Sequence, residues 1–240
     1  MTREPYRVWI GWDPAEVQAY AVARQSLLAH TNAVVHPRPI CRESLLDFYT
    51  RLTETRQNRL WDTISDAPMS TDHAIARFFV PFLCGYAGWA LFVDGDVLFR
   101  ADVKALFAEA DERYAVQVVQ HPPLLEEGFK KDGAVQQPYP RKNWSSVILW
   151  NCKHPQHAKL TREILNTWPG RDLHRFGWLS DDAIGSLSPH WNHLVGVSPM
   201  TSDPALVHFT LGTPDLVGDG PFSTEWWDVA ATCGVIRAAG

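Results

Sequence analysis

Asp94 and Asp96 are the residues of this sequence whose type and spacing point most directly to chemistry. Carboxylates at positions i and i+2 of an extended chain point to the same side, and Gly95 between them lets another group approach the backbone closely. Two carboxylates this close repel each other unless a proton or a cation intervenes. Oxygen ligands favour Mg²⁺ or Mn²⁺, and such an ion also binds diphosphates. We therefore expect a metal site here, although Asp-Gly is also a common turn dipeptide.

The residues before this motif predict that it lies at the end of a buried strand. Residues 89–93 (WALFV) form a continuous apolar run, which is typical of a strand covered on both faces. In open α/β sheets, ligands bind beyond the carboxyl ends of the strands. Further strands are expected at 7–12, 34–40, 97–99, 114–120, 146–150, 193–197 and 205–209. Helices are expected at 14–30, 70–85, 102–110 and 156–167.

This alternation predicts a single α/β domain with a mostly parallel central sheet flanked by helices. Asp13 is expected to cap the first helix, with Pro14 at its first position. Pro37 and Pro39 confine their strand to a sheet edge or a break, and Pro81 should kink the second helix. Residues 42–67 have no clear periodicity, and residues 215–240 read as a Gly/Pro-rich tail. Residues 121–142 predict a long loop, and loops of this length are usually functional.

The composition of the 240 residues narrows the class of protein. Hydrophobic residues make up 45% and charged residues 20%, which excludes a disordered or fibrous chain. A net charge of −5 argues against general binding of nucleic acids, so a phosphorylated ligand would need a local device such as a metal ion. The four cysteines lack the spacing of a zinc knuckle or a redox dithiol. With no signal-like segment and no run of 18 apolar residues, we expect no transmembrane segment and a cytoplasmic location.

Several motifs together resemble the retaining glycosyltransferases of family eight, of the small bacterial and phage type. Residues 70–81 (STDHAIARFFVP) and 89–99 (WALFVDGDVLF) are similar to that family's helix with Arg and Pro, followed by a strand ending in Asp-x-Asp. Residues 10–13 (IGWD), 143–146 (NWSS), 181–182 (DD) and 207–214 (VHFTLGTP) keep the family's order. The resemblance implies a single GT-A domain over 1–240. Its nucleotide-binding half would span about 7–100, its sugar and acceptor half about 114–214, and a C-terminal tail 215–240.

The resemblance implies transfer of a hexose-type sugar from a nucleotide-diphosphate donor, with UDP as the expected nucleotide. Mn²⁺ or Mg²⁺ would neutralise the diphosphate and assist its departure. Retention of configuration is compatible with attack on the face that the diphosphate leaves, or with double displacement through a carboxylate. The sequence does not separate these mechanisms. It also leaves open whether the acceptor is a carbohydrate, a lipid-linked molecule or a protein, and which oligomer forms.

The resemblance also implies roles for individual residues. His208 would complete the metal site with Asp94 and Asp96. The residues assigned to the donor are Gly11, Trp12, Asp13 and Tyr20 for base and ribose, Arg77 for ribose and sugar, Asn143, Ser145 and Ser146 for the transferred sugar, and Gly95 and Gly212 within the two metal motifs. Asp181 and Asp182 match an acidic pair that holds sugar hydroxyls near the reacting carbon, and they are the candidate catalytic residues.

Two departures from the family pattern stand out. The family usually has a Lys that contacts the diphosphate shortly after its His-x-x-Gly element, whereas residues 212–215 (GTPD) contain none. Lys142, Lys130 or Lys131 in the long loop could replace it, and the sequence does not show which. The acidic pair at 181–182 also lacks the Gln often found there.

Structural interpretations of the same residues stay open. Asp13 serves as well as a helix cap alone, Arg77 as a structural ion pair, and His208 as a hydrogen-bonded core histidine. The pairs His154/His157 and His190/His193 have the spacing of zinc ligands but lack a third ligand nearby.

Two other functions also fit parts of the sequence. A sugar nucleotidyltransferase would need a glycine-rich loop after the first strand, which residues 11–14 (GWDP) do not provide. A catalytically silent carbohydrate- or nucleotide-binding homologue is compatible with the eleven tryptophans. The intact Asp94, Asp96 and His208 set argues against it, since a lectin has no need of a metal that bridges a diphosphate.

Overall fold

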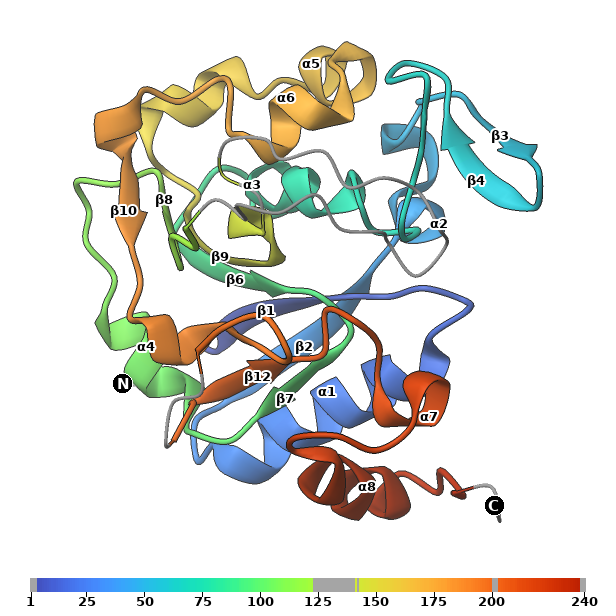
Figure 1. Ribbon diagram of the computed structural model, residues 1–240. Helices are drawn as coiled ribbons and strands as arrows, with labels where there is room; N and C mark the ends of the chain where they lie inside the picture. The colour runs from blue at the N-terminus through green and yellow to red at the C-terminus, as the bar shows by residue number, and fades with distance from the viewer. Residues whose placement is uncertain (1–3, 123–140, 142, 200–202, 238–240) are drawn as a thin grey trace.

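A computed structural model describes residues 4–122, 141, 143–199 and 203–237 (Figure 1). Its centre is a six-stranded sheet in the order β10-β8-β9-β6-β1-β2. The strands are β1 (Tyr6–Gly11), β2 (Val35–Ile40), β6 (Trp89–Val93), β8 (Val116–Val118), β9 (Val147–Asn151) and β10 (Ile184–Ser186). Only β9 runs antiparallel to its neighbours, so the expected mostly parallel sheet is confirmed. Strand β2, with Pro37 and Pro39, lies at the edge, as its prolines require.

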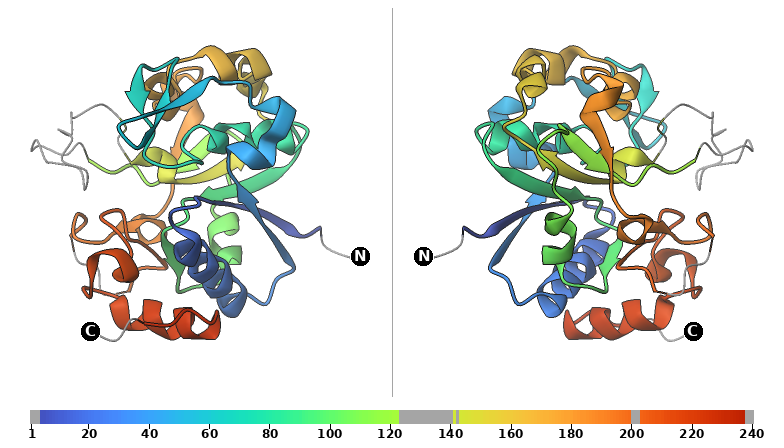
Figure 2. Two further views of the ribbon diagram at one scale, coloured as in Figure 1. Left: turned by 90° about the vertical axis from the view of Figure 1, so that its right-hand side faces the viewer. Right: turned by 90° about the vertical axis from the view of Figure 1, so that its left-hand side faces the viewer.

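Helices cover both faces of this sheet, as its strand sequences demand. In β1, Val8 and Ile10 pack into the cluster beneath α1 (Val17–His30) and α4 (Val103–Ala108), while Trp9 packs into the opposite cluster. The opposite face is covered by α3 (Val80–Leu83), α5 (Arg162–Thr167) and α6 (Gly170–His174). Figure 2 shows these two helical layers from both sides. The central strands are thus buried on both faces, which explains their continuous apolar runs.

A second, three-stranded sheet lies below the central sheet in the view of Figure 1. It consists of β11 (His193–Leu194), β12 (Leu206–His208) and β7 (Val97–Phe99), in the order β11-β12-β7. Strands β12 and β7 are antiparallel, and their register pairs His208 with Val97. The tail expected at 215–240 instead contains helix α8 (Ser223–Thr232), which follows α7 (Pro214–Val217). Trp226 of α8 is fully buried in a cluster with Val22 of α1 and Val207 of β12.

Residues 42–67, which show no clear periodicity, form two short helices and a small antiparallel meander beside the layer of α3, α5 and α6 (Figure 1). These elements are α2 (Arg42–Leu45), η1 (Leu46–Phe48), β3 (Thr53–Arg56), β4 (Arg59–Asp62) and β5 (Ala67–Pro68). A buried ion pair between Arg51 and Asp62, 2.5 Å apart, lies at the base of the meander. Arg51 also donates hydrogen bonds to the carbonyl oxygens of Leu165 and Trp168. The strands of this segment are tied to α5 through these polar contacts, so they show no apolar period from which they could be predicted.

Several expected helices differ in extent. The first begins at Val17 rather than after Asp13, and Asp13 is not its N-cap. The second reduces to the 3-10 helix η2 (Ala76–Phe79) followed by α3, which has Pro81 in its first turn. The fourth divides into η4 (Pro155–Lys159) and α5, because the Thr161 side chain caps α5. The remaining 3-10 helices are η3 (Trp144–Ser146), η5 (Asp181–Ala183) and η6 (Pro189–Trp191). Among the residues that the structure describes, no helix combines the length and apolar character that crossing a bilayer requires.

Candidate metal centre

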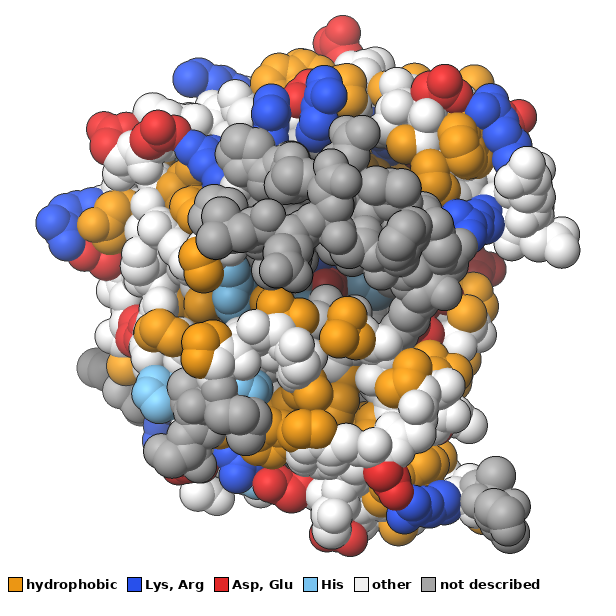
Figure 3. Space-filling view, viewed as in Figure 1, with side chains coloured by type: hydrophobic (Ala, Val, Ile, Leu, Met, Phe, Trp, Pro, Cys, Tyr) orange, Lys and Arg blue, Asp and Glu red, His pale blue; other side chains and the backbone are white. Residues whose placement is uncertain are grey.

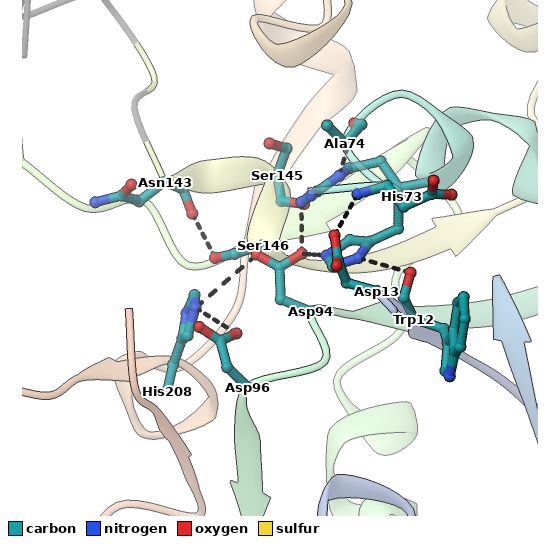
Figure 4. Close-up of polar contacts among 12 residues, drawn as sticks. Trp12, Asp13, His73, Ala74, Asp94, Asp96, Asn143, Ser145, Ser146 and His208 are labelled. Atoms are coloured by element: carbon teal, nitrogen blue, oxygen red, sulfur yellow. Dashed lines mark hydrogen bonds and ion pairs between the residues drawn. The ribbon is translucent and has the colours of Figure 1, made fainter. Parts of the chain in front are cut away.

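Three side chains of metal-ligand type meet where β6 ends and β7 begins. Asp94, Asp96 and His208 each contribute one ligand atom, and these atoms all lie within 4.8 Å of one another. His208 Nε2 is 3.1 Å from Asp96 Oδ1 and 3.9 Å from Asp94 Oδ2 (Figure 4). The register of β12 on β7 places His208 beside this turn. The three residues expected to bind a metal therefore lie together, although 112 positions separate Asp96 from His208.

Arg77 and His73 hold Asp94 from the side away from His208. Arg77 Nη1 lies 2.7 Å and His73 Nε2 3.3 Å from Asp94 Oδ1. The buried guanidinium also donates to the carbonyl oxygens of Ala74 (3.0 Å) and Ser145 (2.8 Å). Burial alone would raise the pKa of Asp94, but Arg77 and His73 outweigh this effect and hold the pKa below its usual range. Asp94 is therefore ionised, with Oδ2 directed towards His208.

The donor set fits a divalent cation. Two carboxylates and an imidazole nitrogen converge on one point, and these ligand types suit Mn²⁺, with the oxygens also suiting Mg²⁺. Burial disfavours the charged form of His208, yet Asp96 and Asp94 outweigh that effect and raise its pKa. The carboxylates thus attract positive charge to the space in front of Nε2, either as a proton or as a metal ion. Figure 3 shows acidic and histidine side chains in a recess at the centre of this face.

The residues expected to hold base and ribose surround the end of β1. An ideal Cβ on Gly11 would lie 2.5 Å from the His73 ring, so only glycine fits there. The Trp12 carbonyl oxygen lies 3.4 Å from His73 Nδ1. Asp13 accepts hydrogen bonds from the backbone N–H groups of Ala15 (2.8 Å) and Asp72 (2.6 Å). Asp13 therefore connects the end of β1 to the segment that carries His73 and Arg77.

Asn143, Ser145 and Ser146 lie on the loop into β9, next to the metal group. Asn143 has a left-handed backbone (φ 65°), which Asn tolerates better than most residues. Its carbonyl oxygen accepts a hydrogen bond of 2.8 Å from Ser146 Oγ. Ser145 Oγ lies 2.7 Å from His174 Nδ1, and the Ser145 carbonyl receives Arg77. This loop is thus connected to Asp94 through Arg77.

The contacts of the other expected site residues involve groups other than the three metal-ligand side chains, or these residues lie outside the described part of the chain. Asp181 and Asp182 begin η5 with exposed side chains, and Asp181 forms an ion pair with Arg141. Tyr20 is half-buried in α1, where burial raises its pKa. Gly212 lines a cavity of about 140 Å³ between the segment that follows β12, α7 and the start of α8. Lys142, Lys130 and Lys131, with most of the expected 121–142 loop, lie outside the described residues.

Sequence reasoning missed three residues around the centre. His73 contacts Asp94, and Asn192 Oδ1 lies 3.0 Å from His208 Nδ1. His121, which follows β8, has a buried Nε2 that meets no hydrogen-bond partner among the residues that the structure describes. Burial, with smaller contributions from His208 and His193, lowers the pKa of His121 to about 4. His73 lies within the matched motif at 70–81, but no local pattern distinguishes Asn192 or His121, because their contacts join distant parts of the chain.

The histidine pairs considered as zinc ligands have other contacts. His157 Nε2 lies 3.1 Å from the Ala115 carbonyl oxygen, and its Nδ1 lies 3.4 Å from the indole nitrogen of Trp178. His190 Nδ1 lies 3.0 Å from the Asp203 carbonyl oxygen. Within the described segments, the acidic and histidine group at β6, β7 and β12 is the one that could hold a metal.

Solved structures with the same fold are glycosyltransferases. GlyE of Streptococcus pneumoniae TIGR4 superposes with a TM-score of 0.58 and 18% identity, covering 94% of this chain and 60% of that chain. The galactosyltransferase LgtC, solved with donor and acceptor sugar analogs, superposes with a TM-score of 0.58 and 13% identity, covering 97% of this chain and 98% of that chain. Mouse xyloside xylosyltransferase 1 superposes with a TM-score of 0.50 and 10% identity, covering 85% of this chain and 97% of that chain. This chain spans about 60% of the length of the GlyE chain, and the likeness shows the GT-A fold.

The sequence also has a curated relative. No protein-family model matches it. Protein CDI of Arabidopsis thaliana, however, is 40% identical over 231 residues, covering 93% of this chain and 85% of that protein. At this identity and coverage, the chain belongs to the family of Protein CDI.

Proposed function

We propose that this protein is a metal-dependent retaining glycosyltransferase. It would move a hexose-type sugar from a nucleotide-diphosphate donor, with UDP as the first candidate, to a carbohydrate, lipid-linked or protein acceptor. The observation that carries this proposal is the Asp94, Asp96 and His208 group at the carboxyl end of β6. In open α/β sheets this end is where ligands bind. The glycosyltransferase neighbours of the same fold support the same assignment.

In this proposal, Asp94, Asp96 and His208 would hold Mn²⁺ or Mg²⁺. When bound, the ion supplies charge neutralisation for a departing diphosphate. Arg77 keeps Asp94 ionised and oriented, since it fixes Oδ1 and leaves Oδ2 for the ion. Gly11 and Gly95 allow the end of β1 to contact the metal-ligand turn directly. Trp12 and Asp13 follow Gly11 and would border the base and ribose.

The loop into β9 would form the sugar side of the site. Asn143, Ser145 and Ser146 lie beside Arg77 and the metal group, so a donor sugar attached to the diphosphate would meet this loop. Asp181 and Asp182 are proposed to contact sugar hydroxyls. Their exposure means that such contact requires the substrate to extend towards η5.

Two observations favour a second candidate, a homologue that binds the nucleotide without transferring sugar. Asp181 pairs with Arg141 with its side chain 93% exposed, whereas a carboxylate that stabilises a reacting carbon is normally desolvated. The sequence after Gly212 also lacks a lysine for the diphosphate. Binding and turnover must therefore be measured separately.

The experiment is a screen of UDP- and GDP-sugars for metal-dependent hydrolysis, followed by proton NMR. Turnover with release of the sugar in its original anomeric configuration supports a retaining transferase. The Asp96→Asn variant should lose turnover, whereas Asp203→Asn, an exposed charge change in another loop, should keep it. Metal-dependent nucleotide binding without turnover of any donor would instead support the silent homologue.

A further inference from the structure

A buried chain of hydrogen bonds runs behind the metal group, on the side of His208 away from the carboxylates. His208 Nδ1 lies 3.0 Å from Asn192 Oδ1. Asn192 Nδ2 lies 2.8 Å from Ser146 Oγ, and Ser146 Oγ lies 2.8 Å from the Asn143 carbonyl oxygen. Asn192, Ser146 and His208 are all at least 95% buried, so water does not compete for these contacts.

The Asn143 carbonyl oxygen, at the end of this series of hydrogen bonds, determines the direction of each of them. A backbone carbonyl oxygen only accepts, so Ser146 Oγ must donate its single proton to Asn143. The Asn192 atom that faces Ser146 must then be the NH₂ group, which donates to Oγ. Asn192 therefore presents its oxygen to His208, and His208 Nδ1 must carry a hydrogen to donate to it.

This polarity leaves His208 Nε2 with its lone pair when the ring is neutral. That nitrogen faces Asp96 Oδ1 at 3.1 Å and Asp94 Oδ2 at 3.9 Å. A lone pair directed at two carboxylates is unfavourable without a cation between them, and it is the form that a metal ligand needs. The opposite tautomer would present a hydrogen there and compete with the metal.

We propose that Asn192 is a positioning residue of the metal centre, which fixes His208 in the tautomer and ring orientation that expose the Nε2 lone pair to the ion. The inference rests on the proposed metal-dependent function. Outer partners of metal-ligating histidines commonly fix the ring in this way, and their loss typically lowers metal affinity by about 10–100-fold. Asn192 is anchored at the end of η6, where β11 begins beside β12, so its position is set by the small sheet that also carries His208.

The first test reads the tautomer in metal-free protein. Nitrogen-15 NMR at alkaline pH distinguishes protonated from unprotonated imidazole nitrogens, and a His208→Gln spectrum assigns the His208 signals among the ten histidines. The wild type should show a hydrogen on Nδ1 alone. Asn192→Leu should shift the hydrogen towards Nε2, where the Asp96 carboxylate accepts it. Asn192→Asp should keep the hydrogen on Nδ1, because Asp also accepts from that atom. An unchanged His208 spectrum in Asn192→Leu would overturn the inference.

The second test measures Mn²⁺ affinity of the same variants by electron paramagnetic resonance. Asn192→Leu should weaken Mn²⁺ binding by about 10–100-fold, with Asn192→Asp closer to wild type. Asn166→Leu is the matched control. Like Asn192, Asn166 is a buried amide with hydrogen-bond partners on both its oxygen and its nitrogen, but it lies in α5 and its partners are backbone groups. This variant should lose stability and keep Mn²⁺ affinity.

The two tests separate this inference from the proposed function. If wild-type protein binds no Mn²⁺, the proposed function fails, while the NMR spectra still decide whether Asn192 sets the tautomer. If wild-type protein binds Mn²⁺ and Asn192→Leu binds it equally well, the positioning role is wrong. If Asn192→Leu does not fold, Ser146→Ala serves instead, because it frees the Asn192 amide to rotate. A hydrogen signal on Nε2 in Ser146→Ala supports the inference, and an unchanged spectrum contradicts it.

Discussion

An ideal Cβ atom on Gly95 would lie 2.5 Å from the carbonyl oxygen of Gly11. The turn between Asp94 and Asp96 therefore meets the end of β1 through backbone atoms alone. A Cβ on Gly11 would in turn overlap the His73 ring. Glycine at both positions allows three separate segments to converge on the metal group, and any larger residue would force them apart.

Gly95→Ala should damage both stability and metal binding. The new methyl group meets a backbone oxygen, which cannot move aside as a flexible side chain can, so we expect a loss of about 1–3 kcal/mol in the free energy of unfolding. The displaced turn should also weaken Mn²⁺ binding at least about tenfold. Gly220→Ala is the control, since a Cβ there meets nothing within 4 Å. Urea unfolding and Mn²⁺ titration measure both effects, and wild-type values for Gly95→Ala would contradict the packing described.

Arg77→Met should destabilise the fold because it removes the cation nearest to the largely buried Asp94 carboxylate and leaves only histidines beside it. Breaking a buried ion pair by removing one partner typically costs about 3–5 kcal/mol. The double variant Arg77→Met/Asp94→Asn removes both charges and should be more stable than Arg77→Met alone. Chemical unfolding of the two variants tests this coupling. Equal stabilities would show that Arg77 does not serve Asp94.

Acid should destabilise the protein through His157. Burial lowers the pKa of His157 from 6.5 to about 4, opposed by the hydrogen bond to the Ala115 carbonyl, so the folded state binds this proton less readily than the unfolded state does. The contribution to stability is full above pH 6.5 and is lost as the pH falls towards 4, with a total of about 3 kcal/mol. Unfolding free energies measured across this range should fall less steeply in His157→Gln than in the wild type. Parallel pH profiles would contradict this assignment.

The central sheet could be predicted because its strands carry their own signals. Residues 89–93 are apolar at every position since β6 is covered on both faces, and Pro37 and Pro39 place β2 at an edge. The acidic motif could be placed at the end of β6 for the same reason. The resemblance to known glycosyltransferases then connected His208 with Asp94 and Asp96, which no local pattern does.

Features determined by long-range contacts were not predictable in this way. Asp13 has the chemistry of a helix cap, yet it accepts a hydrogen bond from Asp72, 59 residues away. Asn192 belongs to the centre only because β11 pairs with β12. The meander at β3–β5 rests on the buried Arg51–Asp62 pair, so its sequence lacks an apolar period.

The proposed function depends on a divalent ion, held by Asp94, Asp96 and His208, that binds a nucleotide diphosphate. The most direct measurement is calorimetric titration of UDP with Mn²⁺ present and after chelation, on the wild type, Asp96→Ala and Asp203→Asn. We predict Mn²⁺-dependent UDP binding that Asp203→Asn retains. Asp96→Ala should weaken this binding more than about 100-fold, beyond the loss typical of an outer partner. UDP binding that is unaffected by chelation or by Asp96→Ala would contradict this prediction, as would the absence of binding by UDP and GDP alike.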